Sequence, residues 1–423
     1  MEHPSILRLN DQCLLKIFSY LNILELIKLE EVCRRFQNVV EEIYRHHWKK
    51  LDFLHLAKEL NIVLHSEEAE VIAGKIGAHV NELIIILNSD EEIHQRYVLK
   101  QTPIVPNSIL QKCSQNIQHL HIEYFNVEDN LDNLNELFDK LKSLKLINCQ
   151  LRDEDIPALR FATNIRILDL SFNHEMKGSF LPFLRNIEEI SLESCFLIQS
   201  NFLEFCQNNP TIRSLNVAYG AFIDQECVNS LAKIPLENLE ILKIGCNSFV
   251  NLGILADFPK LVHVEVKGRR VQDLDVFVER FTIHDQLKHL IISLVDDSTA
   301  LNMITKFTKL KYLKIQYGDF SNMVLNQLSC KNTLEELHVL NSNNLNSTDL
   351  LKCVIGCQAL KVLNVRYCED ITDEFVSDLL PHLRSRPGPL EIWASDSKIT
   401  KNIESNVQHQ NLKFNWDQID DWV

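Results

Sequence analysis

Hydrophobic residues recur through most of this chain in one nine-residue frame. The clearest copy is LKSLKLINC, residues 141–149, which has apolar residues at positions one, four and six and a cysteine at position nine. Ten further copies begin at Ile117, Ile165, Ile187, Ile212, Leu239, Leu261, Leu287, Leu310, Leu334 and Leu360. The copies follow one another at intervals of 22 to 27 residues, which is the spacing of leucine-rich repeats.

Each copy of the frame predicts a short parallel strand and a return helix, as in IPALRFAT (156–163) or SDLLPHLRS (377–385). Side chains alternate along a strand, so positions four and six enter the core and positions three, five and seven point outward. The predicted fold class is therefore α/β, a leucine-rich repeat horseshoe with parallel strands on the concave face and helices outside. The outward positions form a polar surface with charges of both signs.

The array is less regular at both ends. Val80, Leu83 and Ile85 fit a degenerate first repeat, and the charges and prolines between residues 88 and 106 predict an exposed loop insertion. Imperfect strands at 390–392 and 412–414 are expected to close the core. The acidic tail, residues 415–423, either caps the last repeat or folds across the concave face, and the need to cover that end favours the cap.

The N-terminal residues follow a different, helical pattern. Leu14, Ile17, Phe18 and Leu21 recur at i, i+3, i+4 and i+7, which predicts one amphipathic helical face. A second apolar run of helical spacing extends from residue 29 to residue 43. A segment of about 45 residues is close to the lower size limit for an independent core, so a packing partner is expected.

This run resembles an F-box. Leu9 opens it, Ile17 to Leu21 (IFSYL) forms its centre, and Val32 to Arg35 (VCRR) closes it. Departures from the family pattern are Asn10 in place of Pro, Gln12 in place of Glu and Phe36 in place of Trp. The alternative is a helical cap on the first repeat. A cap requires only amphipathic character, whereas this run matches particular residues at particular spacings, and this favours the F-box.

The resemblance implies a non-catalytic role in ubiquitin transfer. F-box segments of leucine-rich repeat proteins bind the linker subunit of SCF cullin-RING ubiquitin ligases, and the repeats hold a protein substrate. The chain would then be a substrate adaptor, whereas the alternative is a protein-binding scaffold without ubiquitin transfer. The resemblance assigns the linker contact to Leu9, Leu14, Ile17, Phe18, Leu21, Leu26, Val32, Cys33 and Phe36.

The predicted substrate contacts lie on the concave face and along an aromatic edge. Position eight of the frame carries Tyr124, Phe172, Tyr219, Tyr317 and Tyr367. Aromatic residues are favoured in protein interfaces, although each ring could instead pack beside the turn of the next repeat. The candidate substrate contacts are Tyr219, Lys243, Tyr312, Tyr317, Arg366 and Tyr367.

Composition excludes several other functions. A net charge of -15 argues against nucleic acid as the main partner. The longest apolar run, near residues 83–87, is too short for a membrane span, and with no secretory signal at the start we expect a cytosolic or nuclear protein. The twelve cysteines include no CxxC pair and are expected to be reduced and structural, like Cys149, Cys195 and Cys368 at position nine.

No motif for enzymatic chemistry is present. The sequence contains no GxSxG, P-loop, GxGxxG, HExxH or zinc-finger spacing, so neither a catalytic residue nor a cofactor is predicted. His119 and His121 share one strand face and could begin a metal site, but no nearby cysteine or carboxylate completes four ligands.

The domain assignment is F-box at 6–50, linker and degenerate repeat, with a loop insertion, at 51–116, leucine-rich repeats at 117–414, and tail at 415–423.

Overall fold

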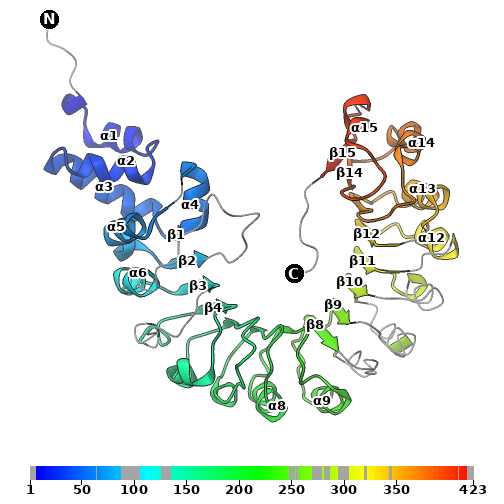
Figure 1. Cartoon of the computed structure of the whole chain (residues 1–423), viewed down its shortest axis with the longest axis horizontal. Coiled ribbons are helices and arrows are strands. Elements are labelled where there is room, and N and C mark those ends of the chain that lie inside the picture. The colour runs from blue at the N-terminus through cyan, green and yellow to red at the C-terminus, as the bar shows by residue number, and fades with distance from the viewer. Residues whose placement is uncertain are drawn as a thin grey trace, which may run out of the picture. The chain divides into compact units, whose positions relative to one another are not determined.

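A computed structural model describes most of the chain. It covers residues 6–62, 64–86, 105–124, 134, 136–246, 253, 256, 258–268, 279–280, 286–293, 304–318, 322–342, 345–407 and 409–416. These residues form two compact units, Met1–Asn209 and Pro210–Val423. In each unit the strands line one side and the return segments lie on the other (Figure 1).

The first unit begins with helices and continues into a parallel sheet. Its strands follow sequence order in the sheet: Lys50–Asp52 (β1), Glu82–Ile86 (β2), His119–Glu123 (β3), Ser143–Ile147 (β4), Ile167–Asp169 (β5) and Glu189–Ser191 (β6). Its α-helices are Asp11–Phe18 (α1), Ile23–Glu30 (α2), Arg34–His47 (α3), Phe53–Leu60 (α4), Ser66–Ile76 (α5), Val105–Cys113 (α6) and Gln199–Asn208 (α8). Its 3-10 helices are Ile6–Arg8 (η1), Gly77–His79 (η2), Asp153–Asp155 (η3), Pro157–Phe161 (η4) and Leu181–Phe183 (η5).

The second unit continues the same architecture. Its parallel strands are Ser214–Val217 (β7), Ile241–Cys246 (β8), His263–Gly268 (β9), His289–Ser293 (β10), Tyr312–Gln316 (β11), Glu336–Leu340 (β12), Val362–Asn364 (β13), Leu390–Trp393 (β14) and Leu412–Asn415 (β15). Its described helices are Gln225–Leu231 (α9), Asn322–Leu328 (α12), Ser347–Gly356 (α13), Asp373–Leu383 (α14) and Lys401–Asn406 (α15). No helix in the described ranges has the length and apolar character needed to cross a bilayer.

The predicted repeat frame sets the register of the sheet. In all eleven copies the strand begins at frame position three, and positions four and six are buried, as with Leu144 and Leu146 in β4. Equivalent frame positions face each other across neighbouring strands, for example His121 and Lys145. The leucine-rich repeat prediction is confirmed. In the segment predicted as a degenerate first repeat, β2 buries Leu83 and Ile85 fully.

Two local features add detail to the predicted pattern. The return helix predicted within residues 156–163 is present as a 3-10 helix, Pro157–Phe161. The same tighter form occurs in Leu181–Phe183, within the repeat that begins at Ile165 and is only 22 residues long, where a short connection favours it. Strand β1 was not predicted, because three residues carry too little alternation to be recognised.

A ladder of backbone hydrogen bonds joins successive repeats at frame position two. In the first unit the N–H of Lys142 donates to the carbonyl of Gln118 over 2.7 Å, and the N–H of Arg166 donates to the carbonyl of Lys142 over 2.8 Å. In the second unit Glu335 donates to Lys311 over 2.7 Å and Lys361 donates to Glu335 over 2.7 Å. In both units, a repeat donates in this way to the one before it, at the point where its strand begins.

Position eight has a backbone requirement that the sequence did not reveal. Tyr124, Phe172, Tyr219, Tyr317 and Tyr367 all have a positive φ, between 55° and 64°, which side chains other than glycine seldom adopt. The left-handed turn directs the backbone N–H toward the next repeat: Tyr124 donates to Ile147 over 3.0 Å and Tyr317 to Leu340 over 3.0 Å.

Position nine is where a buried side chain ties one repeat to the preceding one. The thiols of Cys149, Cys195 and Cys368 donate to the position-six carbonyls of the repeats before them, over 3.6, 3.1 and 3.1 Å. The described cysteines are free thiols, and these three are buried, as predicted. Burial raises the pKa of Cys195 to about 12, which keeps the thiol protonated as a donor.

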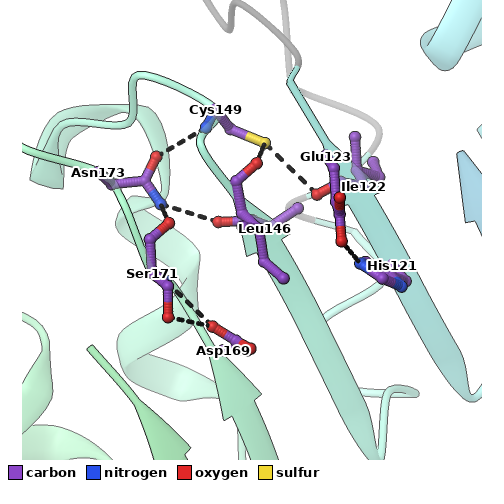
Figure 2. A network of polar contacts seen from close by, with 9 residues as sticks. His121, Ile122, Glu123, Leu146, Cys149, Asp169, Ser171 and Asn173 are labelled. Atoms are coloured by element: carbon purple, nitrogen blue, oxygen red, sulfur yellow. Dashed lines mark hydrogen bonds and ion pairs between the residues drawn. The ribbon is translucent and has the colours of Figure 1, made fainter. Parts of the chain in front are cut away.

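Asn173 replaces cysteine at position nine of its repeat and forms a larger network (Figure 2). Its Nδ2 donates to the carbonyls of Leu146 and Leu170, each over 2.8 Å, and its Oδ1 accepts the N–H groups of Cys149 and Leu151 over 3.0 and 3.1 Å. The side chain is fully buried. One amide thus satisfies backbone groups from two neighbouring repeats.

Both irregular segments of the array are only partly described. Residues 87–104, most of the predicted loop insertion, lie outside the described residues, and so do residues 417–423 of the tail. At the start of the tail, the Trp416 ring stacks on Phe414 with centroids 5.6 Å apart, and its Nε1 donates to Glu404 in α15 over 2.7 Å. The role of the tail as a cap stays a prediction.

Candidate functional site

The first candidate site is built by helices α1 to α3. The side chain of Asn10 caps α1 by accepting the N–H of Cys13 over 2.8 Å, so the departure from proline at this position still provides a helix start. Asn22 and Glu25 form a reciprocal capping box at the start of α2, with both hydrogen bonds at 3.0 Å. These caps stabilise two eight-residue helices, which are too short to be stable in isolation.

Four of the residues predicted to contact the linker form the core of this domain. Leu14, Phe18, Leu26 and Phe36 are at most 4% exposed. The rings of Phe18 and Phe36 meet edge to face with centroids 4.9 Å apart, which joins α1 to α3. In this arrangement they support a docking surface from within. Their role as direct contacts stays a prediction.

The remaining predicted linker residues reach the surface, together with three that were not predicted. Ile17 and Val32 are 42% and 61% exposed, while Leu9, Leu21 and Cys33 are half-buried. Thirteen large apolar side chains are exposed among the described residues, and five of these lie in one short stretch. We call these five the apolar docking patch: Ile6, Leu7, Ile17, Tyr20 and Val32.

Such a concentration of exposed apolar side chains is unusual on a free surface and is typical of an interface. Ile6, Leu7 and Tyr20 were missed for different reasons. Tyr20 lies three residues after Ile17 on the helical pattern, so its signal was present in the sequence. Ile6 and Leu7 precede the periodic run, and only the 3-10 turn of η1 places them beside the helices.

Arg35 fixes η1 against the start of α3. Its Nε donates to the carboxylate of Asp11 over 2.8 Å, one guanidinium nitrogen donates to the carbonyl of Leu7 over 2.7 Å, and the other donates to the carbonyl of Leu9. A planar guanidinium can make all three bonds at once. Arg35 therefore orders the segment that carries Ile6 and Leu7.

Replacing Arg35 by Gln should loosen η1 while the helices stay folded. Loss of the guanidinium removes three hydrogen bonds, so amide hydrogen exchange at residues 6–9 should become at least about tenfold faster. Arg34→Gln is the matched control, because Arg34 is exposed and has no hydrogen bond to this segment in the described structure. Equal exchange rates in the two variants would contradict the assigned role of Arg35.

The second candidate site is the strand face of the second unit, where charged residues lie in one cluster. Glu265 is only 6% exposed and pairs with Lys243 over 3.1 Å and with Lys267 over 3.4 Å. Burial alone would raise the pKa of Glu265, but the two lysines outweigh it and hold that pKa below its usual range. The Lys267 ammonium also lies 5.3 Å from the ring centre of Tyr219.

Beside this cluster, a row of rings crosses successive strands. Ring centroids are separated by 5.4 Å between His263 and His289, by 5.8 Å between His289 and Tyr312, and by 4.7 Å between Tyr312 and His338. The row ends at Trp393, whose ring meets His338 edge to face at 5.5 Å. We call these five residues the ring ladder. Parallel pairing in register places His289 directly between His263 and Tyr312. His338 lies two residues further along β12, where it is paired with Lys314.

The first two rings of the ladder are uncharged near neutral pH. Burial lowers the pKa of His263 to about 4, assisted by His289 and Lys243. Burial also lowers the pKa of His289. At the other end, a hydrogen bond from His338, 3.3 Å away, holds the pKa of Glu336 below its usual range. A row of rings beside paired charges is suited to binding a protein segment by stacking and hydrogen bonds.

The structure places some of the predicted substrate contacts on the strand face, whereas it buries one of them, Arg366. Tyr312 lies within the ring ladder. Lys243 pairs with Glu265, which also pairs with Lys267, and the Lys267 ammonium lies over the Tyr219 ring. Tyr219 and Tyr317 are each 39% exposed, and Tyr367 is half-buried. Their contact with a substrate stays a prediction.

Arg366 is the exception among these contacts. It is 1% exposed, and its guanidinium lies 4.8 Å from the ring centre of Trp393. This burial argues against a direct substrate contact by Arg366. Trp393 was missed because it lies where the repeat frame loosens, whereas the histidines of the ladder occupy the regular outward positions three and five.

The described residues contain no group of three or more His, Cys, Asp or Glu side chains arranged to hold a metal ion. His121 instead bonds to Glu123, with Nε2 and Oε1 2.6 Å apart (Figure 2). The arrangement of this chain is that of a leucine-rich repeat protein preceded by a small helical domain with an exposed apolar surface.

Comparison with known proteins identifies the helical domain. Residues 8–53 match the F-box-like family model. The chain therefore combines an F-box-like domain with leucine-rich repeats, an architecture typical of non-catalytic adaptors. No curated relative matches the chain.

Several solved structures resemble the chain in fold. An internalin, InlF, from Listeria monocytogenes has 14% identity and a TM-score of 0.43, covering 82% of this chain and 93% of that one. The yeast Rad7 and Elc1 complex has 12% identity and a TM-score of 0.44, covering 99% of each chain. The Leptospira interrogans protein LIC12759 has 13% identity and a TM-score of 0.42, covering 82% and 98%. At these scores the likenesses carry no functional argument.

Proposed function

We propose that this protein is a substrate-recognition adaptor of an SCF-type ubiquitin ligase. Its F-box-like domain would dock to the linker subunit, and through it to the cullin and RING subunits. The strand face of the repeats would hold a protein substrate. The observation that carries the proposal is the F-box-like match over residues 8–53, on a domain whose apolar docking patch is exposed.

The proposed mechanism is positional. An associated enzyme would carry activated ubiquitin, and this chain would raise the effective concentration of substrate lysines beside it. Such a role requires no catalytic side chain in the adaptor. It requires two separate binding surfaces, and the apolar docking patch and the ring ladder are on different units of the chain.

The test is affinity purification of the full chain from cells in which protein degradation is blocked. We expect the linker, cullin and RING subunits to co-purify, together with a ubiquitinated protein. The comparison variant carries Ala at Tyr219 and Tyr312, which removes two rings from the strand face. This variant should retain the ligase subunits and lose the substrate.

Two outcomes would overturn the proposal. If no ligase subunit co-purifies with the wild-type chain, the F-box-like domain does not act as a ligase adaptor. If a partner binds the strand face and the ligase subunits are absent, the chain is a repeat scaffold without ubiquitin transfer. Loss of the substrate and the ligase subunits together in the tyrosine variant would indicate misfolding, which circular dichroism detects.

A further inference from the structure

A cavity of about 600 Å³ lies at the edge of the second unit where strands β11 to β13 begin. Lys311, Glu335 and Lys361, each at frame position two, line one side, and the loop from Pro387 to Pro389 before β14 lines another. Lys413 of β15 completes the lining. We call this cavity the edge pocket. Its volume is within the range of pockets that bind small molecules or a few side chains.

The carboxylates of the edge pocket already have partners within the protein. The two oxygens of Glu335 accept from Lys311 over 2.6 Å and from Lys361 over 2.5 Å. These two hydrogen bonds lower the pKa of Glu335 to about 2, so it is ionised at any physiological pH. Glu391 accepts from the Trp393 indole over 2.8 Å and from the Asn415 amide over 3.2 Å.

The pocket therefore carries a surplus of positive charge. Three lysines face two carboxylates, which leaves one net positive charge in a chain whose net charge is -15. Lys413 is exposed and has no ion-pair partner among the described residues. An amine in this position attracts a negatively charged group from outside the chain.

Part of the pocket wall is apolar, and the loop that forms it is anchored to the repeat core. Ala359, Val362 and the two prolines of the loop present partly or fully exposed apolar surface. Arg386, directly before the loop, is 6% exposed and donates to the carbonyls of Val354 over 2.8 Å and Leu360 over 2.5 Å. A loop anchored in this way is preorganised, which reduces the entropy lost when a ligand binds.

From these features we infer that the edge pocket binds an acidic peptide segment, in which carboxylates meet the lysines and an apolar side chain meets the proline wall. The identification of this segment as part of the substrate rests on the proposed function. The binding itself does not, because it is measured on this chain without any ligase subunit.

The experiment measures fluorescence anisotropy of a labelled heptapeptide of alternating glutamate and leucine added to the full-length chain. A glutamine-and-leucine peptide of the same length is the neutral control. We expect saturable binding of the acidic peptide only, weakened by salt. Lys413→Gln should weaken binding about tenfold, because it removes the unpaired charge. Glu335→Gln should strengthen binding about threefold, because it releases two lysines from their shared carboxylate.

Opposite effects of two charge changes in one pocket separate electrostatic recognition from damage to the fold. The matched control is Lys233→Gln, an equal charge change at an exposed site after α9, which should leave the affinity unchanged. The inference fails if the neutral peptide binds equally well, if Lys233→Gln weakens binding as much as Lys413→Gln does, or if no saturation occurs up to about 1 mM peptide, the weak end of specific binding. Linker binding by the F-box-like domain is scored separately, so its loss tests the proposed function alone.

Discussion

A chain that carries Lys at both Ile17 and Val32 should lose binding to the linker subunit by more than about 100-fold. Both side chains are exposed, so replacing them should leave the helices folded. In the complex, each ammonium would be buried in an apolar interface without a partner, and an unpaired buried charge costs several kcal/mol. Surface plasmon resonance with the immobilised linker subunit measures the loss.

The position of the substitutions decides what this experiment reports. Leu14 has the same helical periodicity as Ile17 but is fully buried. Lys at Leu14 would therefore disrupt the core and abolish binding by unfolding the domain, without testing the docking surface. Val71→Lys is the matched control, because Val71 is 52% exposed on α5, outside the docking patch. If the double variant binds as tightly as Val71→Lys, the apolar docking patch is not the linker surface.

Asn173→Ala should lower the free energy of unfolding of the first unit by about 4 kcal/mol. The substitution removes the acceptor of two backbone N–H groups and the donor to two carbonyls, all in the buried turn between repeats. Buried polar groups that lose a partner cost about 1–3 kcal/mol each, although part of this cost is recovered by relaxation. Urea unfolding followed by circular dichroism gives the difference.

Asn164→Ala is the control for this prediction. Asn164 is exposed, and its amide makes one hydrogen bond to the carbonyl of Asp139 over 2.6 Å, so its loss should cost no more than about 1 kcal/mol. Equal destabilisation by the two substitutions would show that the Asn173 network adds nothing beyond a surface hydrogen bond.

The repeat architecture was predictable because one spacing is repeated eleven times. Burial at positions four and six follows from the alternation of side chains, and it holds from Leu120 to Leu363. The left-handed backbone at position eight was not predictable, since the residues there include tyrosine, which gives no sign of a positive φ. Asn173 was likewise hidden, because its role depends on carbonyls of the previous repeat.

The candidate sites were also predictable only in part from the sequence. Helical periodicity located the F-box-like core, but it did not separate Leu14, which is buried, from Ile17, which is exposed on the same helix. The contacts of Arg35 with Leu7 and Leu9 join residues more than 25 positions apart, beyond the reach of local pattern. On the strand face, Tyr312 and Arg366 both occupy outward positions of the frame, but Tyr312 is half-buried whereas Arg366 is fully buried beside Trp393 of an irregular repeat.

The position-two ladder has a consequence for how the chain forms on the ribosome. Because Lys142 donates backward to Gln118 and Arg166 donates backward to Lys142, each bond becomes available as soon as the later residue emerges. A newly made repeat can thus add to a surface that already exists, without waiting for distant sequence. The growing end exposes one unfinished sheet edge at a time, and that edge is covered by the next 22 to 27 residues to be synthesised.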